Sequence, residues 1–120
     1  MTILLVDDDT DFRTAFAENL RDDGHRVVEL DTPPDDPEAL ELADVGMVVA
    51  DYHLPRQTGL AFADAFHAAH PRVPVVVITA DPSGYIDAAI DRRPFARLQR
   101  KPIDFQEFEA LIEGVNVRER

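Results

Sequence analysis

Short apolar runs alternate along this chain with segments of helical periodicity. Unbroken apolar runs are typical of strands buried on both faces of a sheet, whereas apolar positions three and four residues apart are typical of helices. The pattern predicts strands at about 2–6, 25–30, 47–50, 73–78 and 95–99, and helices at about 10–22, 37–43, 58–69, 82–92 and 104–113. This order predicts an α/β fold, with a parallel sheet covered by helices on both faces.

Local signals at the ends of the predicted helices support several of these boundaries. Asp36-Pro37 and Asp81-Pro82 each resemble an N-cap followed by the proline that is favoured in the first helical turn. Asp104 and Glu107 have the spacing of a capping box, and Gly114 is expected to end the last helix.

The length of the chain predicts one domain. A chain of 120 residues can bury one hydrophobic core and is too short for a second, so we assign 1–120 to a single domain, with 115–120 as a tail or the start of a linker. The absence of cysteine excludes disulfides, thiolate metal sites and cysteine nucleophiles. No apolar stretch approaches the roughly 20 residues that span a bilayer, and Met1 leads directly into a strand, so a cytoplasmic location is expected.

Charge is distributed unevenly along the chain. The net charge is −12, and residues 1–60 carry 15 acidic and 4 basic side chains, against 9 and 8 in residues 61–120. An acidic chain gives no support to nucleic-acid or membrane binding, which basic residues favour. The basic residues cluster at Arg92, Arg93, Arg97, Arg100 and Lys101. Lys101 is the only lysine beside eleven arginines, which suggests that its position requires a compact ammonium group.

Four of the apolar runs lead to chemically reactive side chains, namely Asp7-Asp8, Asp51, Thr79 and Lys101. Parallel strands share one carboxyl edge, where open α/β sheets bind ligands, so these side chains are expected to meet there. Three neighbouring carboxylates repel one another unless a cation lies among them, and oxygen ligands of this kind suit Mg²⁺. Three carboxylates, one lysine and one Mg²⁺ have a net charge of zero. Asp9, which follows the pair, is better explained as a helix N-cap.

Asp51 has two chemical roles open to it, metal ligand and nucleophile. A carboxylate can accept a phosphoryl group as an acyl phosphate when a metal, a lysine and hydrogen-bond donors hold the transferred charge. Thr79 offers a hydroxyl and Lys101 an ammonium for that purpose. Each residue alone is unremarkable at such a position, but together they favour phosphoryl chemistry.

The combination of motifs resembles the receiver domains of two-component response regulators. The matching segments are Ile3–Asp8, Asp51–Pro55 with Gly59 eight residues after the aspartate, Ile78–Ala80, and Lys101-Pro102. The resemblance covers essentially the whole chain. It implies a flavodoxin-like, doubly wound sheet of order 2-1-3-4-5 with five helices on both faces.

The resemblance also implies roles for the strand-end residues. Asp51 would be the phosphoacceptor, receiving a phosphoryl group from a sensor histidine kinase or a histidine phosphotransfer protein. Asp8 and Asp51 would bind Mg²⁺ directly, together with the backbone carbonyl of His53, and Asp7 would act through water. The domain would be a phosphoprotein of phosphorelay signalling that catalyses only its own phosphorylation and slow autodephosphorylation.

Further implied roles concern the phosphoryl group and its readout. The backbone amides of His53 and Ala80 would contact the phosphoryl oxygens, Lys101 would pair with them, and the bond before Pro102 is expected to be cis. Thr79 would turn toward the new oxygens and repack the face made by helix 82–92, strand 95–99 and helix 104–113, which can regulate an output, relay the phosphoryl group or form a homodimer.

Leu98 departs from the family pattern. Many relatives place an aromatic residue three positions before the lysine, where it rotates with the threonine, whereas this chain has a leucine without a hydroxyl. We therefore include Leu98 in the expected switch region but do not expect an aromatic switch there.

Two other classes of protein compete with the receiver interpretation. Phosphatases of the haloacid dehalogenase type also use an aspartyl nucleophile, Mg²⁺, threonine and lysine. Their motif matches Asp7 and Asp9 but not Asp11, and 120 residues is short for such an enzyme. A pseudo-receiver that binds partners without phosphorylation would usually lack the acceptor or an acidic residue, and here all are present.

Overall fold

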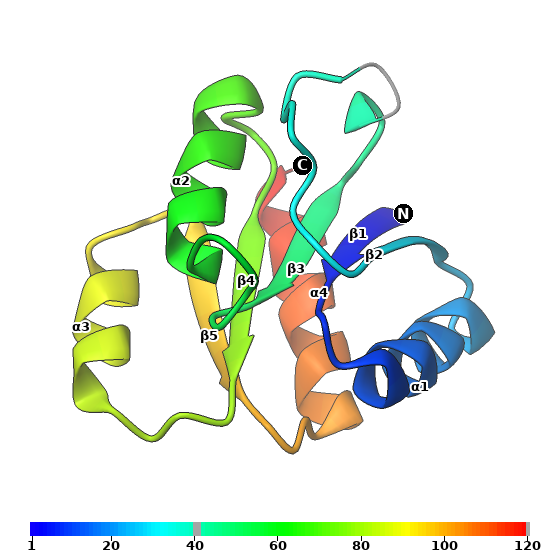
Figure 1. The fold of residues 1–120 in the computed structure, drawn as a ribbon. Helices are drawn as coiled ribbons and strands as arrows, with labels where there is room; N and C mark the ends of the chain where they lie inside the picture. The colour runs from blue at the N-terminus through cyan, green and yellow to red at the C-terminus, as the bar shows by residue number, and fades with distance from the viewer. Residues whose placement is uncertain (40–41, 120) are drawn as a thin grey trace.

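A five-stranded parallel sheet forms the centre of the molecule (Figure 1). The computed structural model describes residues 1–39 and 42–119. Its strands are β1 (Thr2–Val6), β2 (Arg26–Leu30), β3 (Met47–Asp51), β4 (Val75–Thr79) and β5 (Ala96–Arg100). They lie in the order β2-β1-β3-β4-β5, and every adjacent pair is parallel. The predicted flavodoxin-like order is therefore confirmed.

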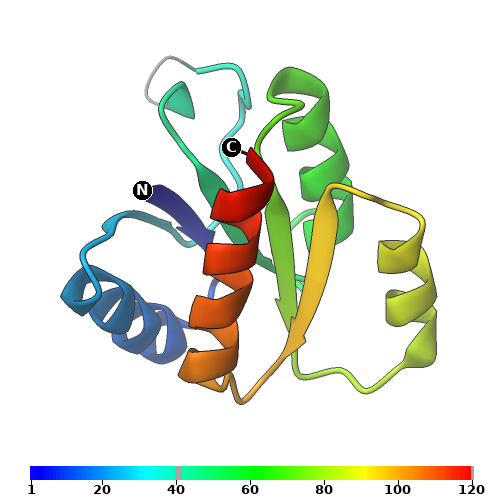
Figure 2. The ribbon, with the colours of Figure 1, turned by 180° about the vertical axis from the view of Figure 1, so that it is seen from behind.

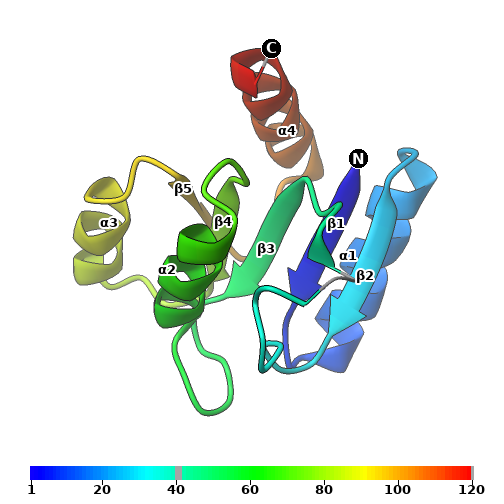
Figure 3. The same cartoon turned by 90° about the horizontal axis from the view of Figure 1, so that it is seen from above.

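Within residues 1–39 and 42–119, four α-helices cover the two faces of the sheet. They are α1 (Thr10–Asp22), α2 (Gly59–Ala69), α3 (Gly84–Asp91) and α4 (Phe105–Glu119). Figure 2 shows α1 and α4 on one face, and Figure 3 shows α2 and α3 on the opposite one. None of the helices in the described part of the chain is both long and apolar enough to cross a bilayer.

One hydrophobic cluster lies on each side of the sheet. Beneath α2 and α3 the fully buried side chains include Leu4, Val6, Phe62, Phe66 and Ile86. Beneath α1 and α4 they include Ile3, Leu5, Leu20, Ile78 and Phe108. Alternate residues of one strand thus enter opposite clusters, which explains why the central strands are apolar without alternation.

The helix expected at 37–43 is not among the described elements. Residues 40–41 lie outside the described residues, and the neighbouring residues form tight turns in which Ala39 N donates to Asp36 O at 3.2 Å and Leu42 N to Ala39 O at 2.9 Å. Such bonds between residues three apart belong to 3₁₀ geometry, which rarely extends beyond a few residues. The described residues thus contain four α-helices where five were predicted, and the middle of the predicted helix at 37–43 lies outside them.

Two predicted helix boundaries also differ. Helix α3 begins at Gly84 with Ser83 as N-cap, because the Asp81 carboxylate accepts from Ser83 N at 2.9 Å and closes a turn of its own. Helix α4 does not end at Gly114 but continues to Glu119. At its start, Asp104 caps the helix as expected, since its Oδ1 accepts from the backbone N of Gln106 at 2.9 Å and of Glu107 at 3.2 Å.

Candidate functional site

Three carboxylates meet at the carboxyl edge of the sheet. Asp7 and Asp8 follow β1, and Asp51 ends the adjacent strand β3. One carboxylate oxygen from each lies within 4.8 Å of the others. Asp7 and Asp51 are buried, whereas Asp8 is exposed. The predicted convergence of these side chains therefore occurs, with one side of the cluster open to solvent.

Lys101 joins two of the carboxylates. Its Nζ donates to Asp51 Oδ2 at 2.8 Å and to Asp7 Oδ2 at 3.0 Å. It also lies 4.2 Å from the centroid of the Phe12 ring, in a cation–π contact. Burial by itself would lower the pKa of Lys101, but the hydrogen bonds to Asp51 and Asp7 outweigh it and raise the pKa above its ordinary value. The ammonium therefore stays charged at this edge.

Asp7 accepts further hydrogen bonds through its carboxylate and its backbone carbonyl. The backbone N of Asp9 donates to Asp7 Oδ1 at 2.9 Å, and Arg13 Nη1 donates to the Asp7 carbonyl at 2.7 Å. Burial nevertheless raises the pKa of Asp7 above its ordinary value, because desolvation outweighs the hydrogen bonds from Asp9 and Lys101. A carboxylate in this environment gains from an additional cation nearby.

The loop after β3 folds back on the strand. The backbone N of His53 donates to Asp51 Oδ1 at 3.0 Å, and Gly59 N donates to Tyr52 O at 2.6 Å. A Cβ at position 59 would lie 2.1 Å from the Asp51 carbonyl oxygen. This distance is too short for any side chain at that position. The glycine eight residues after Asp51 is therefore needed for the loop to approach the strand so closely.

Thr79 ends β4, beside β3, but its hydroxyl is hydrogen-bonded within the loop that follows β4. Thr79 is fully buried, and its Oγ1 accepts from Asp81 N at 3.0 Å, while its carbonyl accepts from Lys101 N at 2.8 Å. Ala80, which follows, is exposed. Asp81 also reaches the β3 loop, since its Oδ2 lies 3.3 Å from His53 Nε2.

The structure brings most of the sequence-predicted residues together, but the Thr79 hydroxyl is bonded to Asp81 N and not to the carboxylates. The structure brings Asp7, Asp8, Asp51 and Lys101 together, and the backbone of His53 joins them. Leu98 lies apart, partly buried against the cluster beneath α2 and α3. The Lys101-Pro102 bond is cis, as the resemblance implies.

Sequence reasoning missed the supporting contacts of Phe12 and Arg13. Both lie in the first turns of α1. The Phe12 ring contacts Lys101, and Arg13 donates to the Asp7 carbonyl. Their proximity to Asp7 in the sequence was the available signal. The contact with Lys101, however, depends on how α1 packs beside the end of β5.

The donor set fits a hard divalent cation. Carboxylate oxygens from Asp7, Asp8 and Asp51 can converge on one point, and such oxygen ligands with one open side are characteristic of Mg²⁺ sites.

Comparison with known families gives this geometry a context. The family model of the response regulator receiver domain matches residues 3–113. The chain belongs to this family. It is a phosphorylation-switched signalling domain of the kind found in two-component systems, where receiver domains are partnered with histidine kinases. The match over nearly the whole chain favours this family over the phosphatases of the haloacid dehalogenase type.

Individual relatives agree with this assignment. The chain is 29% identical over 114 residues to the phosphoglycerate transport system transcriptional regulatory protein PgtA of Salmonella typhimurium, covering 93% of this chain and 27% of the relative. It is 28% identical over 117 residues to the DNA-binding transcriptional regulator NtrC of Escherichia coli, covering 92% and 24%. The chain therefore spans about a quarter of the length of these curated relatives.

A solved structure supports the fold at lower sequence identity. A two-component response regulator from Clostridium difficile superposes with a TM-score of 0.88 and 13% identity, covering 100% of this chain and 98% of that one. At this identity the likeness shows the receiver fold alone.

Proposed function

We propose that Asp51 is the phosphoacceptor of this receiver domain, taking a phosphoryl group from the phosphohistidine of a sensor histidine kinase or a histidine phosphotransfer protein. The observation that carries the proposal is the environment of its two carboxylate oxygens. One accepts from Lys101 Nζ at 2.8 Å and the other from His53 N at 3.0 Å. Donors so placed can stabilise negative charge at the acceptor without further reorganisation.

The proposed transfer leaves the domain covalently modified. A carboxylate oxygen of Asp51 attacks phosphorus, the P–N bond to the partner histidine breaks, and the departing imidazole takes up a proton. Lys101 neutralises charge at the acceptor, and the amides of His53 and Ala80 serve as further donors to the phosphoryl oxygens. The catalysis that we propose is limited to this modification and its slow hydrolysis.

Mg²⁺ is the cofactor that we propose for the transfer. Asp8, Asp51 and the carbonyl of His53 would hold the ion directly, and Asp7 would act through water. When bound, the ion neutralises charge on the transferring phosphoryl oxygens. The support from this chain is the set of three carboxylates whose oxygens converge within 4.8 Å.

The readout that we propose starts at Thr79. Its hydroxyl would leave the Asp81 amide, turn toward the phosphorylated Asp51 and alter the face made by α3, β5 and α4. Leu98 belongs to this face without being an aromatic switch. The face would contact an output partner or a second copy of the chain. The domain, residues 1–120 with net charge −12, would make no direct contact with nucleic acid.

Labelling with a small acyl phosphate tests the acceptor. With Mg²⁺ and acetyl phosphate, intact-protein mass spectrometry should show one added phosphoryl group on the wild type and none on Asp51→Asn. Chelation of Mg²⁺ should abolish the addition. Asp104→Asn is the matched control, because asparagine caps a helix as well as aspartate does and the site is left intact.

Three results would contradict the proposal. Equal labelling of Asp51→Asn would place the modification on another residue. Sustained turnover of a generic phosphomonoester would indicate a phosphatase. A protein that is unlabelled by acetyl phosphate and shows no spectral change at Thr79 or Leu98 on adding beryllofluoride would be a pseudo-receiver.

A further inference from the structure

Arg100, the last residue of β5, binds the loop that connects β4 to α3. Its Nε donates to the Asp81 carbonyl at 3.0 Å, and its Nη2 donates to the Ser83 carbonyl at 3.3 Å. The side chain thus satisfies two backbone acceptors of residues 80–83, immediately after Thr79. A lysine could not make this set of contacts, since they use the separate nitrogens of a planar guanidinium.

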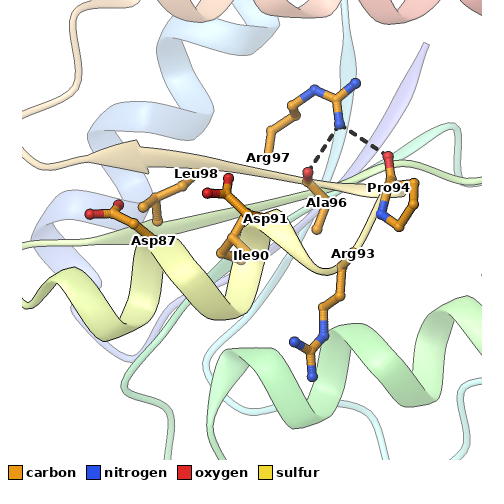
Figure 4. Close-up of a pocket in the computed structure, with 8 residues that line it drawn as sticks. All are labelled: Asp87, Ile90, Asp91, Arg93, Pro94, Ala96, Arg97 and Leu98. Atoms are coloured by element: carbon orange, nitrogen blue, oxygen red, sulfur yellow. Dashed lines mark hydrogen bonds between the residues drawn. The ribbon is translucent and has the colours of Figure 1, made fainter.

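The same guanidinium also binds α3 itself. Nη1 and Nη2 of Arg100 donate to the two carboxylate oxygens of Asp87 at 3.0 Å and 3.4 Å. Figure 4 shows Asp87 near Leu98 at one end of a groove of about 430 Å³ between α3 and β5. Arg100 therefore joins three segments: β5, the loop 80–83 and the first turn of α3.

Helix α3 depends on contacts of this kind. It has eight residues, and the side chain of its N-cap, Ser83, makes no capping hydrogen bond. A helix this short is not stable by itself in water. Its apolar anchors are Ile86 and Ile90, which are buried against the sheet. The Asp87 pair with Arg100 supplies the polar anchor at the N-terminal end.

Asp81 links Arg100 to Thr79. The Asp81 backbone N donates to Thr79 Oγ1 at 3.0 Å, while the Asp81 carbonyl accepts from Arg100 Nε at 3.0 Å. If the Thr79 hydroxyl turns toward a modified Asp51, the Asp81 amide loses its acceptor. The loop must then move to find another, and its movement strains the bonds to Arg100.

We propose that Arg100 is a positioning residue that couples Thr79 to α3. It holds the loop 80–83 and the first turn of α3 in the resting arrangement and loosens when Thr79 turns toward the phosphorylated acceptor. The polar coupling takes the place of an aromatic switch, because Leu98 has no group that could hydrogen-bond with Thr79. This inference rests on the proposed function, since it needs a phosphoryl group at Asp51.

Amide hydrogen exchange of α3 tests the coupling in the 120-residue chain. We compare the wild type with Arg100→Gln, each at rest and with Mg²⁺ and beryllofluoride. In the wild type, beryllofluoride should speed exchange of the α3 amides. In Arg100→Gln, exchange at rest should already be faster by about tenfold, and beryllofluoride should add less than about twofold. Asp87→Asn should give an intermediate resting rate, because the bonds from Arg100 to the loop carbonyls remain.

Arg97→Gln is the matched control on the same strand. Arg97 points away from α3 and donates to the carbonyls of Pro94 and Ala96 at 3.1 Å and 3.0 Å (Figure 4). Its removal takes away the same charge without touching the loop 80–83, so exchange of α3 should follow the wild type. Thermal unfolding of each variant shows that the comparison is made between folded proteins.

The outcomes separate this inference from the proposed function. Wild-type exchange and a wild-type beryllofluoride response in Arg100→Gln would overturn the coupling, and so would equal acceleration in Arg97→Gln. A wild type that is labelled on Asp51 by acetyl phosphate but shows no change in α3 would overturn the coupling alone. A wild type that acetyl phosphate does not label, and that shows no spectral change at Thr79 or Leu98 with beryllofluoride, would overturn the proposed function, and the coupling with it.

Discussion

Lys101 Nζ lies 2.8 Å from Asp51 Oδ2, although β5 and β3 are separated in the sheet by β4. The same ammonium binds Asp7 Oδ2 at 3.0 Å, so one cation holds the carboxylate that ends β3 and the one that follows β1. The acceptor that we propose is thus positioned together with a second, fully buried carboxylate. This arrangement has consequences for stability as well as for chemistry.

Asp7→Asn should stabilise the folded protein at pH 7. Burial raises the pKa of Asp7 above its ordinary value of 3.8, so the ionised form is less favourable in the folded than in the unfolded chain. Removing that charge should therefore raise the free energy of unfolding at pH 7. Urea unfolding of both proteins measures the difference.

The advantage of Asp7→Asn should depend on pH with a defined sign. It is fully present above the raised pKa of Asp7. It should shrink as the pH falls through that pKa toward 3.8, because the folded wild type then takes up the proton before the unfolded chain does. Asp11→Asn, at an exposed position in the first turn of α1, is the control. A difference that grows on acidification would show that Asp7 is not destabilised by its ionisation.

Mg²⁺ should stabilise the wild type through Asp8. At about ten times its dissociation constant, the ion should raise the free energy of unfolding by about 1.4 kcal/mol, as expected for a ligand that binds only the folded state. Asp8→Asn should lose most of this gain, whereas Asp11→Asn should keep it. Thermal unfolding with and without MgCl₂ at constant ionic strength makes the comparison, and an undiminished gain in Asp8→Asn would remove this residue from the metal site.

Gly59→Ala should destabilise the protein by about 3 kcal/mol or more, because the new Cβ would overlap the Asp51 carbonyl oxygen and force the backbone apart. Gly84→Ala is the matched control. A Cβ at position 84 meets nothing within 4 Å, and the residue begins α3, so this change should be neutral or slightly stabilising. Equal effects of the two substitutions in urea unfolding would contradict the close approach at Gly59.

Gly114→Ala should stabilise the protein by about 0.5–1 kcal/mol. Helix α4 passes through this position, a Cβ there meets nothing within 4 Å, and alanine has the higher helix propensity. The helical signal in circular dichroism should be unchanged or slightly larger. A loss of stability would instead indicate that the glycine ends the helix, as the local sequence pattern suggested.

Local sequence signals were reliable for strands and less so for helix ends. The five apolar runs predicted the strand boundaries to within two residues. A strand that is buried on both faces needs apolar side chains at successive positions, so such a run is a direct signal of it. The Asp81-Pro82 signal failed because an aspartate can close a turn on Ser83 as readily as it can cap a helix. The Gly114 signal failed because a glycine costs a helix only about 1 kcal/mol, which packing of Phe108 and Ile112 can outweigh.

The sequence by itself determined the strand order, through the family resemblance, and the set of side chains that meet at the carboxyl edge. It could do so because parallel strands share that edge whatever the details of packing. Only the tertiary structure decided that Lys101 binds Asp7 and Asp51 together over Phe12, and that Arg100 joins the loop 80–83 to α3. These contacts depend on which neighbouring segments the long side chains at the end of β5 can reach. A local sequence pattern does not predict how close those segments lie in the folded protein.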